Sequence, residues 1–282
     1  MREDIADFFV AALLGGAVGD ALGGAGTDDT QQTLVVVESI LDRGGIDPTD
    51  VARRLLEMWR HGKRDGYDPT FQQTMERLDA GVPHASAASV DLPSSGAMMR
   101  MGPVGLWHWQ QGEEIRQDAM ALCHVTHRDA RAVAAAVAVA HVVGHLMTHR
   151  PMDVEEVIEV AEWSARPVDE ATGEVIGQLR TLLEMPAPAA CRALLEMPGE
   201  APVTAAVALE AFLRTPGDFE ATVRRALETG GGTSAAVAGA LSGTYNGMLP
   251  GHLVDGLPEG ERIQGLGEAL YRKTVEGTAL EA

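Results

Sequence analysis

The stretch that decides the fold lies near the N-terminus and reads IADFFVAALLGGAVGDAL from Ile5 to Leu22. It is almost entirely apolar, and glycines stand at positions 15, 16 and 19. Small residues at such spacing allow two helix backbones to approach closely, and an apolar helix of this kind is typical of a core. We therefore predict that this stretch is a buried helix.

The rest of the chain continues the helical pattern. Aromatic residues make up only 4% of the sequence, and the β-branched or aromatic runs typical of strands are scarce. Apolar residues recur at helical spacing in segments 31–41, 50–61, 70–80, 114–124, 130–148, 153–165, 170–184, 202–213, 218–229 and 234–247. No shift in composition marks a linker. We expect an all-α protein with one compact multi-helix domain over residues 1–282.

The charge balance restricts the partners. The chain has 41 acidic and 22 basic residues and a formal charge of −19, so most of its surface would repel a polyphosphate backbone or an anionic membrane. We therefore expect no nucleic-acid backbone binding and no membrane association. The same acidity leaves carboxylates for a divalent cation, which would screen the charge of a small phosphorylated ligand.

Several features favour a reducing, cytoplasmic location. Cys123 and Cys191 lack CxxC spacing, which argues against a disulfide framework and against a thiolate zinc site. Residues 8–19 imitate the apolar part of a signal peptide, but acidic residues precede them where positive charge would be needed. The longest apolar run, 132–147, is shorter than the roughly 20 residues of a membrane span. It is typical of a central buried helix.

Two short motifs are candidates for a site. Thr27-Asp28-Asp29 stands at a loop-to-helix junction, where neighbouring oxygens could bind a hard cation or simply cap the helix. Residues 230–234, Gly-Gly-Gly-Thr-Ser, precede an apolar helix and could present backbone N–H groups to an anion, or form a turn with Thr233 or Ser234 as N-cap. Each motif alone leaves both alternatives open.

Three histidines form a weaker pattern. His141, His145 and His149 are four residues apart, so neighbouring pairs share a helix face and could bind a transition metal. The helical zinc motif also needs Glu directly after the first His, where this chain has Val142. We therefore interpret these histidines as ordinary core or surface residues.

Taken in order, these segments resemble the ADP-ribosylglycohydrolase family. Residues 15–23 are similar to its opening helix, and Thr27-Asp28-Asp29-Thr30-Gln31 to its first metal motif. Residues 95–105 resemble a ligand loop in which Asn-Gly or Gly-Gly precedes Ala-x-Met-Arg, and Thr126-His127 resembles a pair whose His lies near bound ADP-ribose. Residues 212–214, 218–220 and 229–231 are similar to the approach to the second metal motif, and residues 235–243 to the helix after it.

The resemblance implies a fold, a cofactor and a set of site residues. The family is all-α and usually holds two Mg²⁺ or Mn²⁺ ions. The implied metal ligands are Thr27, Asp28, Asp29 and Thr233. The implied catalytic residues are Asp28, Asp29 and Asp91, and the implied substrate-binding residues are Ser95, Gly96, His127, Gly230, Gly231, Gly232 and Ser234.

The sequence departs from the family in three places. The second metal motif of the family is Gly-Gly-Asp-Thr-Asp-Thr, whereas Gly232 and Ser234 stand here at the two carboxylate positions. We therefore expect one weakly bound ion or none. The insert with a Glu that covers the family's site is missing between Gly23 and Thr27, which predicts a more open cleft. Ser95 replaces the Asn of the ligand loop, and Asp91 is the nearest upstream carboxylate.

Two functions follow from the resemblance. The first is a metal-dependent hydrolase that cleaves a glycosidic bond of ADP-ribose in a modified protein or small molecule. The second is an inactive family member that binds an ADP-ribose-like ligand or serves as an interaction protein, because a fold does not by itself imply a function. In both cases we expect residues 27–29 and 230–234 to face each other across one cleft.

Overall fold

The computed structural model describes residues 5–24, 28–62, 67–88 and 92–280, with side chains to residue 276. The described residues form helices and no strands, which confirms the all-α prediction. The helices are α1 (Ile5–Leu22), α2 (Asp28–Arg43), α3 (Pro48–His61), α4 (Pro69–Asp79), α5 (His84–Ala87), the 3₁₀ turn η1 (Met98–Arg100), α6 (Gly102–Trp107), α7 (Ile115–Cys123), α8 (Ala130–Thr148), α9 (Val154–Ala165), α10 (Glu170–Gly177), α11 (Leu179–Glu184), α12 (Ala187–Leu195), α13 (Glu200–Arg214), α14 (Phe219–Asn246), α15 (Gly251–Val254) and α16 (Gly260–Leu280).

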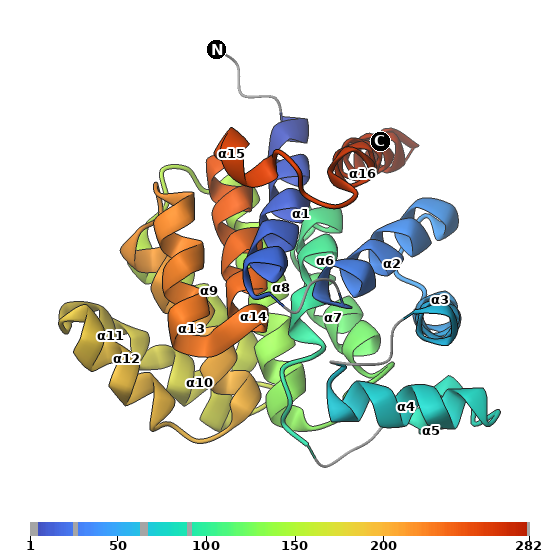
Figure 1. Cartoon of the computed structure of the whole chain (residues 1–282), viewed down its shortest axis with the longest axis horizontal. Coiled ribbons are helices and arrows are strands. Elements are labelled where there is room, and N and C mark those ends of the chain that lie inside the picture. Colours follow the sequence, from blue (N-terminus) through green and yellow to red (C-terminus); the bar gives the residue numbers. More distant parts are fainter. Residues whose placement is uncertain (1–4, 25–27, 63–66, 89–91, 281–282) are drawn as a thin grey trace.

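Glycines bring α1 and α14 into backbone contact at the centre of the molecule (Figure 1). A Cβ atom placed on Gly15 would lie 2.2 Å from the carbonyl oxygen of Gly239, and one on Gly239 would lie 2.1 Å from that of Gly15. Gly19 has the same relation to Ala235, at 2.1 Å. Since no side chain fits at these positions, the glycine spacing of the opening stretch fixes the pairing of α1 with α14.

The apolar run 132–147 lies in α8, which packs against α6, α7, α9, α13 and α14. Almost all of its side chains are buried, as expected for a central helix. By length and hydropathy alone, α1 and α8 would each be able to cross a membrane, but most of both helices is packed inside the protein. Cys123 and Cys191 are both free thiols.

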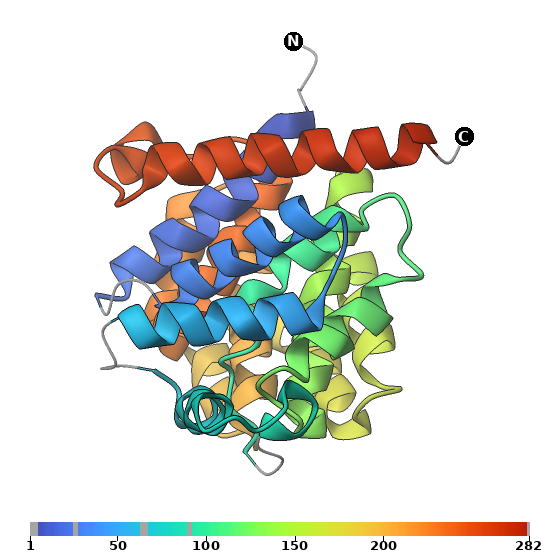
Figure 2. The same cartoon turned by 90° about the vertical axis from the view of Figure 1, so that its right-hand side faces the viewer.

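After residue 98 the chain forms η1 followed by α6, with Gly102 and Pro103 at the start of α6. The structure also adds α16, to which the sequence pattern assigns no element. α16 lies across α1 and α2 (Figure 2). Its glycines interrupt the apolar period, and one of them, Gly267, packs against Val10 of α1.

The glycine turn expected at 230–232 is instead a kink within α14. Gly231 has φ 81° and ψ −166°, which are non-helical, and α14 resumes directly after it. A positive φ combined with such a ψ is accessible essentially to glycine alone. The kink thus divides α14 into two segments, and the second segment begins beside the C-terminal end of α1, where Gly23 packs on Gly232.

Candidate functional site

Carboxylates gather where α1 ends and α2 begins. Asp20, in the last turn of α1, is 6% exposed and accepts hydrogen bonds from the backbone N–H of Thr30 at 3.1 Å and from its hydroxyl at 2.6 Å. Asp28 and Asp29 form the first turn of α2, and Asp29 is 7% exposed. The two hydrogen bonds between Asp20 and Thr30 thus hold the end of α1 against the start of α2.

The kink of α14 faces this cluster. The Thr233 hydroxyl donates a hydrogen bond to the Asp29 carboxylate, which joins the start of the second α14 segment to the start of α2. The expected juxtaposition of the two motifs is therefore confirmed for Asp29 and Thr233. Thr27 lies outside the described residues.

Burial and neighbouring carboxylate charges raise the pKa of Asp28 and of Asp29. Burial and the charge of Asp20 raise the pKa of Asp28 to about 6. Burial, Asp28 and Asp20 raise the pKa of Asp29 well above its usual range, and the hydrogen bond from Thr233 offsets only part of this effect. Like charges this close disfavour simultaneous ionisation, so the cluster favours a positive charge nearby.

The donor set fits a single hard cation better than two. Asp28, Asp29 and Thr233 supply oxygen atoms of the kind that Mg²⁺ and Mn²⁺ prefer. At the other expected carboxylate positions, Gly232 has no side chain, and the buried Ser234 hydroxyl donates to the Gly230 carbonyl at 3.3 Å. Within the described residues no group of three or more His, Cys, Asp or Glu side chains is arranged to bind a metal.

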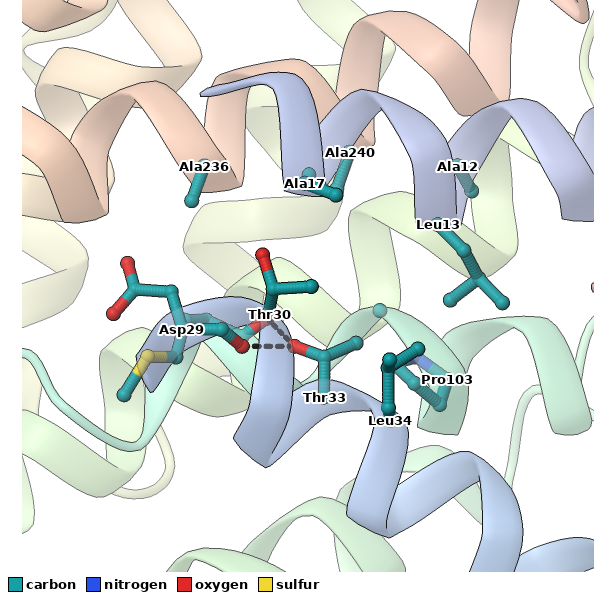
Figure 3. A pocket seen from close by; sticks show the side chains of 13 residues that line it. Ala12, Leu13, Ala17, Asp29, Thr30, Thr33, Leu34, Pro103, Ala236 and Ala240 are labelled. Carbon is teal, nitrogen blue, oxygen red and sulfur yellow. Dashed lines mark hydrogen bonds between the residues drawn. The ribbon is translucent and has the colours of Figure 1, made fainter. Parts of the chain in front are cut away.

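Two cavities adjoin the cluster. One of about 20 Å³ lies between α1, α2 and α14, with Asp29 and Thr30 at its polar side and alanines from α1 and α14 opposite (Figure 3). There the Thr33 hydroxyl contacts the carbonyl oxygens of Asp29, at 2.8 Å, and Met99, at 3.1 Å. The second cavity, about 200 Å³, lies beside Asp20, Gln31 and Glu259. The first is far too small for a nucleotide.

The ligand-loop residues Ser95 and Gly96 contact Glu200 and Asp68, respectively. Ser95 donates from its backbone N–H, at 3.3 Å, and from its hydroxyl, at 3.1 Å, to Glu200 at the start of α13. Gly96 packs on Asp68, where a Cβ would lie 2.5 Å from the carboxylate. Asp91 lies outside the described residues. Ser95 is thus engaged within the protein, and Gly96 provides room for Asp68.

Asp68 and His127 form a buried pair. The Nε2 atom of His127 lies 2.9 Å from the Asp68 carboxylate, and the imidazole is fully buried. Burial raises the pKa of Asp68, but the hydrogen bonds from His127, Ser94 and Thr70 outweigh it and hold the pKa at about 2. Burial lowers the pKa of His127, although the hydrogen bond to Asp68 and the charge of Asp68 act in the opposite direction. The pair is therefore an ionised carboxylate and a neutral imidazole.

Sequence reasoning assigned no role to Asp20, Asp68 or Glu200. Asp68 precedes Pro69 and caps α4, and Glu200 opens α13 after a glycine, so both are typical of ordinary helix starts. Only long-range packing brings them to the cleft. The three histidines at positions 141, 145 and 149 make ordinary contacts within the protein. His141 lies 3.0 Å from the Val137 carbonyl oxygen, and the rings of His145 and His149 stack with their centroids 4.0 Å apart.

The comparisons with known proteins identify the family and the fold. The family model described as ADP-ribosylglycohydrolase matches residues 1–279, and the chain belongs to this family. A solved structure described as an ADP-ribosylglycohydrolase-related protein complex is 30% identical, covers 97% of this chain and 100% of its own, and superposes with a TM-score of 0.79. An uncharacterised protein of Archaeoglobus fulgidus is 28% identical over 255 residues, which are 90% of this chain and 82% of that protein. The family and its fold are those that the motifs indicated.

Proposed function

We propose that the chain hydrolyses a glycosidic bond of ADP-ribose in a modified protein or small molecule. The observation that carries the proposal is the group of carboxylates Asp20, Asp28 and Asp29, in which the charge of Asp20 raises the pKa of both Asp28 and Asp29. Glycosidic cleavage develops oxocarbenium character at the anomeric carbon of the ribose. Carboxylates that lie close to the anomeric carbon stabilise such a charge.

A single Mg²⁺ or Mn²⁺ ion, weakly held, fits beside this cluster. Asp28 and Asp29 would hold it, with Thr27 and Thr233 as neutral donors. When bound, such an ion lowers the pKa of a coordinated water and so generates a nucleophile near neutral pH. Two ions would need the carboxylates that Gly232 and Ser234 lack.

The side chains of the cleft would perform the remaining chemistry. The water oxygen bonds to the anomeric carbon while the glycosidic bond breaks, and an ionised Asp28 takes a proton from the water. The leaving group takes a proton from solvent in turn, while Asp29 would hold the cation and so position the water. Asp91 is a further carboxylate that we propose for this step.

The ligand's phosphates would lie near the kink of α14. The second α14 segment begins after Gly231, and the N-terminus of a helix favours an anion. Backbone groups of Gly230, Gly232 and Thr233 would contact the phosphates, together with Gly96. We place Ser234 and Ser95 in a supporting role, because their hydroxyls already bond to Gly230 and Glu200. We further propose a cytoplasmic location and no role for nucleic-acid backbones or membranes.

The test is a direct assay of free ADP-ribose. The pure protein is incubated with millimolar Mg²⁺ or Mn²⁺ and a panel of substrates with N- or O-linked ADP-ribose, and the released ADP-ribose is measured by chromatography. Asp28→Asn and Asp29→Asn should each abolish release, whereas Asp255→Asn, at an exposed carboxylate before α16, should not change it. Equal rates of ADP-ribose release for all three variants would contradict the carboxylate mechanism.

A second candidate, an inactive protein that binds an ADP-ribose-like ligand or another protein, draws support from Gly232 and Ser234. The buried Ser234 hydroxyl bonds within α14. ADP-ribose that raises the melting temperature without release from any substrate in the panel would favour this candidate over the hydrolase.

A further inference from the structure

Arg100 is a fully buried arginine that forms no salt bridge with a carboxylate among the described residues, although the charge of Asp68 acts on it. Its Nη1 donates to Gln32 Oε1 at 2.5 Å and its Nη2 donates to the Thr126 hydroxyl, while its Nε has no hydrogen-bond partner in the described part of the chain. The neighbouring Cys123 thiol does not neutralise it, because burial raises the pKa of that thiol to about 12. A buried unpaired cation is costly, so stability alone does not explain this arginine.

One arm of hydrogen bonds runs from Arg100 to Asp28. A guanidinium can only donate, so the atom of Gln32 that it contacts must be the amide oxygen. The amide nitrogen then points the other way and donates to the Asp28 carboxylate at 3.3 Å. Arg100 thus fixes the orientation of the Gln32 amide, which holds Asp28.

The other arm runs from Arg100 to Asp68. Since the Thr126 oxygen accepts from Arg100, its own proton is free to point to His127 Nδ1, which lies 2.7 Å away. His127 Nδ1 is then an acceptor, and the ring proton is on Nε2, from which it is donated to Asp68 at 2.9 Å. The ionised Asp68 requires the same tautomer.

We infer that Arg100 is a positioning residue of the cleft, a buried cation from which two hydrogen-bonded arms run outward and end on Asp28 and Asp68. The inference rests on the proposed function in one respect, which is that Asp28 belongs to the reacting cluster. The directions of the hydrogen bonds do not depend on catalysis. Arg100 keeps His127 neutral, with Nδ1 as acceptor and Nε2 as donor.

The test is the ¹⁵N spectrum of the His127 imidazole, recorded from pH 5 to 8 on the full chain. In the wild type we expect a neutral ring protonated at Nε2. Arg100→Met frees the Thr126 hydroxyl to accept a proton from Nδ1, so His127 should become protonated at higher pH than in the wild type. The charged groups acting on this ring are Asp68, Arg100 and Glu200, and none of the variants replaces Asp68 or Glu200.

Matched variants separate this role from a purely structural one. Arg100→Lys keeps the charge and a donor and should retain the wild-type spectrum. Thr126→Val removes the hydroxyl between Arg100 and His127 and should shift the Nδ1 resonance, whereas Thr126→Ser should not. Wild-type spectra in both Thr126→Val and Arg100→Met would overturn the inference, and Thr126→Val decides alone if Arg100→Met does not fold. No substrate is needed, so a failure of the proposed hydrolysis leaves this test intact.

Discussion

Replacing Asp28 by asparagine should make the protein more stable while it inactivates the site. Burial and Asp20 raise the pKa of this carboxyl from 3.8 to about 6, which corresponds to at most about 3 kcal/mol of cost for the ionised form. Asp28 is partly exposed, and solvent screening reduces the figure to about 1–2 kcal/mol. The asparagine oxygen can still accept from Gln32. We therefore expect the melting temperature of Asp28→Asn at pH 7.5, in EDTA, to rise by roughly 2–6 °C.

The pH dependence fixes the sign of this effect. Below about pH 4 the carboxyl is protonated in both the folded and the unfolded chain, so variant and wild type should be equally stable. Between pH 4 and 6 the folded state retains the Asp28 proton that the unfolded state has lost. The wild type therefore becomes less stable than Asp28→Asn as the pH rises through this range. Thermal unfolding across this range, with Asp255→Asn as control, measures the difference. A variant that is less stable than the wild type at pH 7.5 would refute the electrostatic reasoning.

Three further predictions concern packing, the buried pair and the ligand. Gly239→Ala should lower the free energy of unfolding by about 3 kcal/mol or prevent folding, because its Cβ would lie 2.1 Å from a carbonyl oxygen of α1. Gly265→Ala, at an exposed position of α16, should raise the free energy of unfolding by about 0.5–1 kcal/mol in chemical denaturation. Asp68→Asn should lower the free energy of unfolding by about 2 kcal/mol at pH 7, because the folded protein holds the pKa of Asp68 at about 2. In urea titrations this difference between variant and wild type should vanish as the pH falls from 4 to 2. Millimolar Mg²⁺ alone should shift the melting temperature little, and ADP-ribose together with Mg²⁺ should shift it more than either ligand alone. Calorimetry that finds two tightly bound Mg²⁺ ions in the unliganded protein would contradict the single-ion account.

Local sequence patterns were sufficient for most of the fold. The glycines at 15 and 19 predicted a buried helix, and the structure explains them by backbone contact with Gly239 and Ala235. The kink at Gly231 was not predictable in this form, because three consecutive glycines are equally typical of a turn between two helices. The periodicity of α16 is weak for a related reason, since one of its glycines replaces an apolar residue at the contact with α1.

Some residues of the candidate site were predictable from the sequence and others were not. Asp29 and Thr233 belong to short motifs, and their resemblance to the family predicted that they would meet. Asp68 and Glu200 stand at helix starts that carry no sign of a cleft, and their role depends on side chains far away in the sequence. The role of Arg100 was also beyond a local pattern, because it depends on the direction of each hydrogen bond between Gln32 and Asp68.

The most direct test of the account is the rate of ADP-ribose release as a function of Mg²⁺ concentration, measured on the best substrate of the panel. A cleft that works with one cation held by Asp28 and Asp29 predicts a hyperbolic dependence with a single weak dissociation constant in the wild type, and no release at any concentration in Asp28→Asn. A sigmoidal dependence that requires two ions, or release that persists unchanged in EDTA, would contradict it.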